Sequence, residues 1–393
     1  MLKREGAIGR WAMKQLKVLG VIFAGLLIAE LGLRVVGYSV PSLYTTDSER
    51  GLSLRAGAEG WWRKEGEAYI KINSDGLRDR EHVKQKPPGT LRIAVLGDSW
   101  AEAFQVPLEK TFWAVMERKL VECGGLGGRK VEVINFGVSG FGTAQELITL
   151  RRHAREYSPD IVLLAFNAND ITDNSRALRK DDGVPYYIYR DGQLVLDTSF
   201  LNTRNYQLRN STFNVQLKRV RDYSRLLQFL YDLPNVIEAN RAARQSANVP
   251  AAEPGVNPTF YRAPADPDWN NAWALTETLL TIMNDEVVKD GARFLVVTLD
   301  TAIEVHPDPR RREEFMKRLG VSDLTYPNQR IMSLGERAGF EVFNLSPALQ
   351  AYVEQHKVYL HGFGRTLGGG HWNEVGHQVS GELIARKLCE WAH

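Results

Sequence analysis

Five short apolar runs, separated by segments long enough for helices, constrain the fold of this chain more than any other feature. Runs rich in Val, Ile, Leu and Phe are typical of parallel strands that are buried on both faces. They occupy Leu91–Leu96, Val131–Asn135, Ile161–Phe166, Arg293–Leu299 and Phe340–Leu345. The predicted helices are Thr111–Glu122, Ala144–Glu156, Ala274–Asp290, Gln329–Ala338 and Val375–Trp391. This alternation predicts an open, doubly wound α/β fold with a five-stranded parallel sheet.

The alternation is interrupted between the third and fourth predicted strands. Residues 176–268 contain a hairpin pattern around Asp191-Gly192, then a basic helical stretch and a Pro-rich passage. We interpret this segment as an insertion, and a second independent domain is the alternative. Residues 41–90 are mixed and turn-rich, which predicts a linker with an entry hairpin before an α/β domain over residues 91–393.

The amino terminus has the order of an export signal or a membrane anchor. Residues 1–17 contain five cations and one anion, and the predicted transmembrane helix follows over residues 18–40. Its 23 residues correspond to about 34 Å of helix, enough to span a bilayer. The two ionisable residues within it, Glu30 and Arg34, are four apart and can pair near its far end.

The positive-inside rule keeps the basic flank in the cytoplasm and places the chain after the helix in the periplasm or outside the cell. A cleaved signal peptide is the main alternative, although no small-x-small cleavage site follows the run directly. A buried helix of the globular domain is a second alternative. The all-round apolar face and the clustered cations argue against it.

Charge and cysteine content exclude several classes of protein. The chain carries +3 in total while residues 1–17 alone carry +4, so the remainder is close to neutral and argues against a nucleic-acid partner. Cys123 and Cys389 lack the clustered spacing of a zinc site, and we expect no cofactor. Both cysteines end helices expected on one face of the sheet, so we expect them to approach closely enough for a disulfide.

Four motifs are expected at the sheet edge where open α/β folds bind their ligands. The first three strands are followed by Gly97-Asp98-Ser99, by Gly137-Val138-Ser139-Gly140 and by Asn169-Asp170, and His371 precedes the last helix beside three glycines. Each motif has an ordinary alternative as a turn or a helix cap. Together they favour a serine nucleophile with a histidine base.

The four motifs resemble those of the SGNH (GDSL-type) hydrolase family, over about residues 70–393 without the insertion. The resemblance implies a flavodoxin-like, three-layer α/β/α fold, and the anchor with the Asn73…Gly76-Leu77-Arg78-Asp79 lead-in is similar to membrane-tethered bacterial members. It also implies that Ser99 attacks an ester carbonyl with His371 as general base. The oxyanion would be bound by the backbone N–H groups of Ser99 and Gly140 and by the Asn169 amide.

The implied function is a membrane-anchored, extracytoplasmic serine esterase. Its expected substrate is an acyl ester, an acetyl ester above all, of a carbohydrate or a small molecule. An O-acyltransferase that acts on an exported glycan is one alternative. A catalytically impaired protein that binds or assembles glycans is another.

Two positions depart from the family pattern. An aspartate usually stands two or three residues before the histidine, where this chain has Gly368 and Gly369. Asp300, at the end of the fourth strand, is the expected substitute, with a Ser–His dyad or impaired activity as alternatives. The second departure is Asn167 in place of a glycine, and its side chain is expected to narrow the site.

Other candidate residues have packing as their simpler interpretation. His377 is expected in a packed or capping role within the last helix, and His361 is a weaker candidate for the base. Seven aromatic residues are candidates for stacking on sugar rings: Trp61, Trp62, Trp100, Tyr186, Tyr187, Tyr189 and Trp372. The basic stretch over residues 215–246 is most simply a solvated face, with anionic lipid or an acidic glycan as the alternative contact.

Overall fold

The fold is organised around a parallel sheet in a computed structural model that describes residues 2–123, 125–245 and 257–391. Within the described residues the sheet has the strand order β11-β10-β7-β5-β6. Its strands are β5 (Thr90–Gly97), β6 (Lys130–Asn135), β7 (Ile161–Phe166), β10 (Arg293–Thr298) and β11 (Glu341–Asn344). All neighbouring pairs are parallel, which confirms the predicted sheet. The order reverses between β5 and β7, and this switch point is where such folds bind their ligands.

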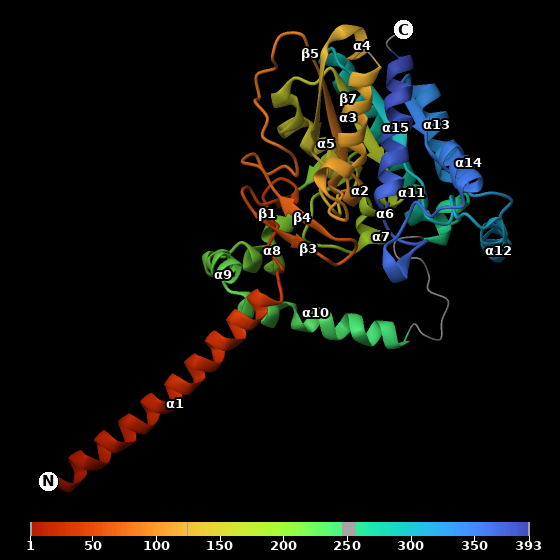
Figure 1. Ribbon diagram of the computed structural model, residues 1–393. Helices are drawn as coiled ribbons and strands as arrows, with labels where there is room; N and C mark the ends of the chain where they lie inside the picture. Colours follow the sequence, from red (N-terminus) through yellow and green to blue (C-terminus); the bar gives the residue numbers. More distant parts are fainter. Residues whose placement is uncertain (1, 124, 246–256, 392–393) are drawn as a thin grey trace. The chain divides into compact units, whose positions relative to one another are not determined.

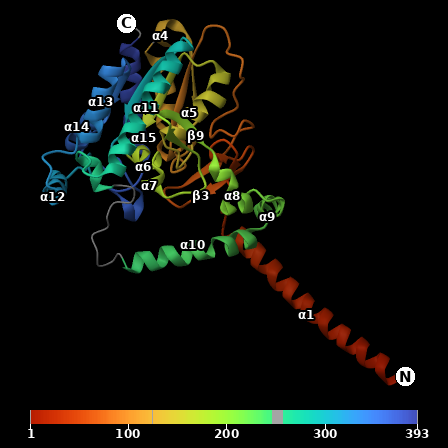
Figure 2. The same cartoon turned by 180° about the vertical axis from the view of Figure 1, so that it is seen from behind.

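Helices cover both faces of the sheet, as Figures 1 and 2 show from opposite sides. Along β5 the side chains alternate: Ile93 and Val95 pack in one core cluster, whereas Ala94 and Leu96 pack in the other. The helices that contribute to the first cluster are α3 (Phe112–Glu122), α14 (Ser346–His356) and α15 (Glu374–Glu390). Those of the second cluster include α5 (Thr143–Arg152), α11 (Pro267–Lys289) and α13 (Tyr326–Ala338). The predicted three-layer α/β/α arrangement is therefore confirmed.

Helices α3 and α15 lie against each other and are covalently joined. Cys123 and Cys389 form a disulfide with their Cα atoms 6.5 Å apart, as their expected approach required. Close packing depends on Gly381, because a Cβ atom there would lie 2.4 Å from the carbonyl oxygen of Phe112. The disulfide ties the first helix of the sheet domain to the last.

The prediction for residues 41–90, a linker with an entry hairpin, agrees with the structure in the hairpin and differs from it in the linker. Residues from Leu43 onward belong to the same compact unit as the sheet. They form two antiparallel hairpins, β1 (Tyr44–Asp47) with β2 (Gly51–Leu54) and β3 (Glu59–Trp62) with β4 (Ala68–Lys71). Their apolar residues, among them Leu43, Leu54 and Ile70, form a core cluster with Phe104 and Phe141. The strands are four residues long, which is too short for the sequence pattern to separate them from turns.

The lead-in segment supports the turn that follows β5. Arg78 is buried, and its guanidinium donates to the carbonyl oxygens of Glu102, at 2.7 Å, and of Val106, at 2.5 Å. Burial lowers the pKa of Arg78 to about 10, against the opposing charges of Glu102 and Asp79. The amino-terminal segment thus holds the backbone beside helix α2 (Ser99–Glu102).

The predicted insertion divides between two compact units. Its hairpin, β8 (Tyr186–Arg190) with β9 (Gln193–Asp197), turns at Asp191-Gly192 as expected and belongs to the unit of the sheet. The other unit comprises Met1–Ser42 and Ser211–Pro250. It contains α1 (Leu2–Val35), α9 (Thr212–Tyr223) and α10 (Arg225–Gln245). The remaining α-helices of the described residues are α4 (Gly125–Gly128), α6 (Asn169–Asp173), α7 (Arg176–Arg179), α8 (Arg204–Arg209) and α12 (Pro309–Leu319).

Helix α1 is displaced from the predicted transmembrane segment. Among the described residues it is the one helix long and apolar enough to cross a membrane, over Met13–Val35, which has 23 residues. The helix ends at Val35, shortly before Gly37, which has a positive φ of 71°. Residues 36–40, which were predicted to be helical, therefore lie outside the helix. The basic flank continues into the same helix instead of preceding it.

Candidate active site

Ser99 lies at the carboxyl end of β5, at the switch point of the sheet. It is the first residue of α2, and the Asp98 carboxylate caps this helix by accepting the N–H of Trp100 at 3.0 Å. The Ser99 Oγ atom lies 2.8 Å from Nε2 of His371. The fold therefore brings the expected nucleophile and base into hydrogen-bonding contact across 272 residues of sequence.

The carboxylate that orients His371 comes from the amino-terminal hairpin. Glu65, in the β3–β4 turn, places Oε2 at 2.6 Å from Nδ1 of His371. Its Oε1 atom accepts the backbone N–H of His371 at 2.8 Å. Burial opposes ionisation of Glu65, but hydrogen bonds from His371 and Gln105 outweigh it and lower the pKa of Glu65. An ionised carboxylate at this position fixes a tautomer with the proton on Nδ1 and a free lone pair on Nε2.

The glycine run before His371 makes room for Glu65. Gly370 has a φ of 78°, and a Cβ atom there would lie 2.3 Å from Oε1 of Glu65. The segment that lacks the family's aspartate is thus shaped to accept a carboxylate from elsewhere. Sequence reasoning missed Glu65 because it lies 306 residues from His371, in a segment interpreted as a linker. The signal that pointed to a distant carboxylate was the missing aspartate itself.

Asp300 does not contact His371, so the expectation that it substitutes for the aspartate is wrong. Its buried carboxylate bonds Nε2 of His361 at 2.7 Å and accepts the indole N–H of Trp372 at 2.9 Å. His361 in turn lies 2.8 Å from the carbonyl oxygen of Gly370 through Nδ1. Asp300 and His361 therefore hold the residues on either side of His371.

His377 has the packed role that the sequence predicts. It is buried in α15, and its Nδ1 atom accepts the backbone N–H of Phe112 at 3.2 Å. Burial holds the pKa of His377 well below its usual value, with the charges of Arg78, His371 and His361 acting in the same direction. A neutral, hydrogen-bonded ring of this kind joins α15 to the start of α3.

The expected oxyanion donors lie at the ends of successive strands. Gly140 follows β6 with a φ of 76°, and the neighbouring Ser139 N–H donates to Oε1 of Glu102 at 3.0 Å. Asn169 follows β7, and its side-chain Nδ2 donates to Asp98 at 2.8 Å and to Asp173 at 3.3 Å. The Asn169 amide is therefore held by two carboxylates.

Asn167 points toward its own loop. Its Oδ1 atom accepts the backbone N–H of Asn169 at 3.4 Å, and its own N–H donates to Asp170 at 3.2 Å. The side chain is nearly buried. It caps the turn before α6, where a glycine would leave the Asn169 N–H without this acceptor.

Buried carboxylates gather next to Asn169. Burial raises the pKa of Asp98, and burial with nearby acids raises the pKa of Glu146 and of Asp170 well above their usual values. The pKa of Asp173 rises to about 6 because burial and the charge of Asp98 outweigh the charge of Arg179. No group of three or more His, Cys, Asp or Glu in the described ranges is arranged to hold a metal ion.

The aromatic residues that are candidates for stacking on sugar rings differ in how much of each side chain is exposed. Trp372, Tyr186 and Tyr187 are buried, which contradicts a role for them in stacking on a sugar. Trp100 is also nearly buried, with its ring centroid 5.1 Å from that of His371. Trp61 is 38% exposed and packs edge-on against Tyr69 on the hairpin that carries Glu65.

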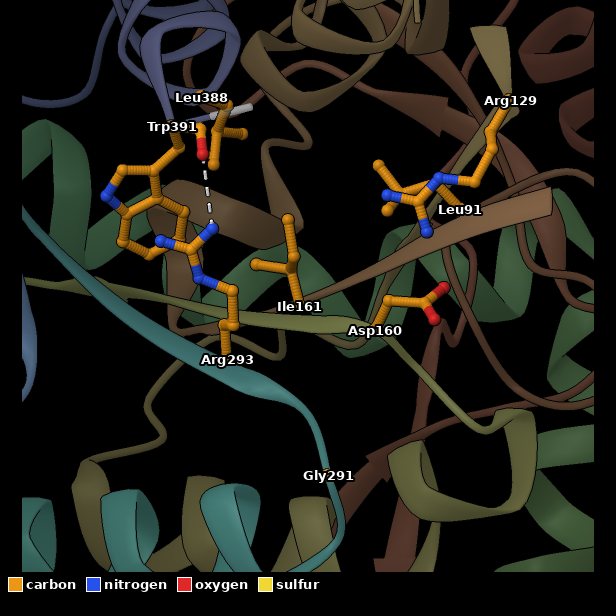
Figure 3. Close-up of a pocket in the computed structure, with 8 residues that line it drawn as sticks. All are labelled: Leu91, Arg129, Asp160, Ile161, Gly291, Arg293, Leu388 and Trp391. Carbon is orange, nitrogen blue, oxygen red and sulfur yellow. Dashed lines mark hydrogen bonds between the residues drawn. The ribbon is translucent and has the colours of Figure 1, made fainter. Parts of the chain in front are cut away.

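A separate pocket lies at the opposite edge of the sheet. It is lined at the amino ends of three strands by residues that include Leu91, Ile161 and Arg293. Figure 3 shows the Arg293 guanidinium over the ring of Trp391, at 3.8 Å from its centroid. Among the described residues that line this pocket there is neither a serine nor a histidine. The candidate active site is therefore the carboxyl edge that holds Ser99.

Comparisons with known proteins give local and low-identity similarities. No protein-family model matches the chain. An arylesterase of Vibrio mimicus is 35% identical over 79 residues, which are 20% of this chain and 38% of the arylesterase. A lipase/acylhydrolase from Enterococcus faecalis has 15% identity and a TM-score of 0.39, over 77% of this chain and 96% of that one. An acetylxylan esterase from Geobacillus stearothermophilus has 12% identity and a TM-score of 0.37, over 79% of this chain and 96% of that one.

The strand order and the strand-end motifs match what the resemblance to SGNH (GDSL-type) hydrolases implies. A flavodoxin-like sheet presents Ser99, Gly140 and Asn169 from three successive strand ends, and His371 reaches Ser99 from the segment before the last helix. The carboxylate that bonds His371 is Glu65, from the amino-terminal hairpin. In that family the corresponding residue is an aspartate two or three residues before the histidine.

Proposed function

We propose that the protein is a membrane-anchored, extracytoplasmic serine esterase that cleaves acyl esters, acetyl esters above all. The observation that carries the proposal is the continuous hydrogen-bonded series from Ser99 Oγ to His371, at 2.8 Å, and from His371 to Glu65, at 2.6 Å. This is the geometry of an activated serine nucleophile. The local similarity to an arylesterase supports an ester as the bond that is cleaved.

The first step transfers the Ser99 hydroxyl proton to Nε2 of His371 as Oγ attacks the ester carbonyl carbon. Glu65 stays ionised, because its pKa is lowered, and stabilises the imidazolium that forms. The imidazolium then protonates the departing alkoxide. Water, deprotonated by the same histidine, then attacks the acyl carbonyl carbon. The bond to Oγ breaks, the acid leaves, and His371 returns the proton to Ser99.

Three donors serve the oxyanion in this proposal: the backbone N–H groups of Ser99 and Gly140 and the amide of Asn169. The Asn169 amide has a shorter bond to Asp98, 2.8 Å, and a longer one to Asp173, 3.3 Å. Breaking the longer bond leaves one N–H for the substrate. Loss of a donor of this kind typically lowers kcat by about 10²- to 10³-fold.

The place and substrate class follow from the rest of the chain. The 23-residue apolar segment Met13–Val35 anchors the protein, and the cations before it keep that end in the cytoplasm. The Cys123–Cys389 disulfide fits an oxidising compartment. The exposed Trp61 and Tyr69, on the hairpin that carries Glu65, suit stacking on a sugar ring and favour an acylated carbohydrate as substrate.

The test of this function is hydrolysis of an activated acetyl ester by wild-type protein and by Ser99→Ala. We expect the substitution to lower kcat by about 10⁶-fold, to the level left by binding groups alone. Circular dichroism of the variant should be unchanged, because Ser99 contributes no apolar packing to either core cluster. A variant that hydrolyses the ester as fast as wild type would exclude Ser99 as the nucleophile.

A further inference from the structure

One member of the ionisable pair of the membrane helix binds the start of α10. The Glu30 carboxylate accepts the backbone N–H groups of Arg225, at 3.0 Å, and of Leu226, at 2.8 Å, and the hydroxyl of Ser224 at 2.9 Å. It thereby caps the helix together with Ser224, whose Oγ accepts the N–H of Leu227 at 3.2 Å. Glu30 therefore has a structural role within the apolar segment, because it binds the start of α10.

The other member of the pair binds the end of α9. Arg34 donates from Nη2 to the carbonyl oxygen of Tyr223 at 2.7 Å, and from Nε to Glu30 at 2.8 Å. Gln228 completes the junction by accepting the N–H of Val40 at 2.9 Å and donating to the carbonyl oxygen of Asp222 at 3.1 Å. In Figures 1 and 2 the end of α1 meets α9 and α10 at this point.

These contacts set the depth of α9 relative to the spanning segment. The apolar window ends at Val35, so Glu30 and Arg34 lie where the helix leaves the hydrocarbon and enters the headgroup region. Because Arg34 bonds directly to the last residue of α9, that end of the helix lies at the same depth. Its surroundings are then the membrane interface.

The exposure pattern of α9 is the reverse of that of a helix packed on a protein in water. Four large side chains at helical spacing are exposed by 74%, 46%, 55% and 82%: Phe213, Leu217, Val220 and Tyr223. The opposite side, with Asn214, Lys218 and Asp222, is half-buried. A helix that turns its apolar stripe outward and carries cations beside it is typical of an interfacial membrane helix.

We propose that α9 lies in the membrane interface, with the stripe of Phe213, Leu217, Val220 and Tyr223 in the lipid. Its exposed cation, Arg219, lies beside the stripe and would then face anionic headgroups, contributing about 1 kcal/mol near such a surface. The insertion would thus act as a second membrane contact beside the anchor. This inference rests on the anchor of the proposed function but not on its chemistry.

The test uses the full chain in vesicles of phosphatidylcholine and phosphatidylglycerol. An environment-sensitive fluorophore is attached at Phe213→Cys or Leu217→Cys, which is selective because Cys123 and Cys389 are paired in a disulfide. Val83→Cys, at an exposed apolar residue of the sheet unit, is the matched control. We expect a blue shift and quenching by lipids with a nitroxide near the headgroup at positions 213 and 217, and neither at position 83.

Two results would overturn the inference. Emission at positions 213 and 217 equal to that at position 83 would show that α9 is in water. A blue shift without quenching by spin-labelled lipid would show that protein covers the stripe instead. Ester hydrolysis, measured on the same vesicles, separates these outcomes from a failure of the proposed chemistry, because none of the labelled positions belongs to the active site.

Discussion

At the scale of single residues, the site depends on a carboxylate that the local sequence around the histidine does not contain. Glu65 makes two hydrogen bonds to His371, one to the ring and one to the backbone N–H, so it fixes both the side chain and the loop. Gly370 leaves the space that Glu65 occupies. The alternative of a catalytically impaired protein was suggested by the missing aspartate before His371. Glu65 supplies a carboxylate in its place, so this argument no longer applies.

Replacing Glu65 tests its role directly. Glu65→Gln keeps the size of the side chain but removes its charge, and we expect kcat for an acetyl ester to fall by about 10⁴-fold because the histidine tautomer is no longer fixed. The matched control is Glu67→Gln in the same turn, whose carboxylate is exposed and pairs with Arg63. Equal activity of the Glu65 and Glu67 variants would show that Glu65 does not position the base, and a pH–rate profile of Glu65→Gln would report the altered histidine.

Sequence alone predicted His371 and the residues that follow strands, and it missed Glu65. Ser99, Gly140 and Asn169 follow buried strands, so their shared edge can be inferred from the order of the apolar runs. Glu65 cannot be inferred in this way, because a four-residue hairpin strand has no fixed relation to a motif 306 residues away. The choice of Asp300 failed for a different reason: the end of β10 is at the correct edge, but the Asp300 carboxylate bonds His361 and Trp372 instead of His371.

At the scale of elements, the pattern of buried strands was sufficient for the sheet. The central strands β5 and β7 are buried on both faces because helices cover both faces, and this gives a signal that turns and hairpins do not share. The hairpins of residues 44–71 have strands of four residues, and an alternation of buried and exposed side chains extends over no more than that length. So short a pattern predicts no more than a linker with an entry hairpin.

The α3–α15 disulfide is expected to contribute to the stability of the sheet unit. It joins residues separated by 266 positions, and bonds that close long loops typically contribute about 2–5 kcal/mol to the free energy of unfolding. The double variant Cys123→Ser/Cys389→Ser should lower the urea midpoint accordingly. Reduction of the wild-type protein should reproduce the loss, and a wild-type midpoint unchanged by reductant would contradict the prediction.

Helix α5 contains a buried carboxyl whose ionisation is expected to destabilise the fold. Within the described part of the chain neither oxygen of Glu146 has a hydrogen-bond partner, and burial with the charges of Asp98 and Asp173 raises its pKa well above the usual value. The contribution of the protonated Glu146 carboxyl to the stability of the fold is fully present below the pKa of about 4.3 that a glutamate has in the unfolded chain. Stability then falls by about 1.4 kcal/mol per pH unit until the folded pKa is passed.

Glu146→Gln removes this dependence and should be more stable than wild type at pH values near neutrality, with the difference diminishing as the pH falls toward the unfolded pKa. Urea unfolding of both proteins under neutral and mildly acidic conditions measures it. The exposed Glu59→Gln on β3 is the control. A Glu146→Gln variant whose stability relative to wild type is the same under both conditions would show that Glu146 does not ionise within the fold's stable range.

At the scale of the whole molecule, two compact units share one chain. The unit with the sheet holds every residue of the proposed triad, and the unit with α1, α9 and α10 holds the apolar helix and the helical part of the insertion. The sequence distributes its charge in the same way, with +4 in the first 17 residues and a nearly neutral remainder. This division predicts that chemistry and membrane contact can be altered independently of each other.

The central claim is that Ser99 is a nucleophile activated by His371 and Glu65. Intact-mass and peptide analysis of the full chain after treatment with a fluorophosphonate tests it most directly. We expect one adduct, on the peptide that contains Ser99, which is absent in Ser99→Ala and forms more slowly in Glu65→Gln. An adduct on another residue, or labelling of Ser99→Ala at the wild-type rate, would contradict it.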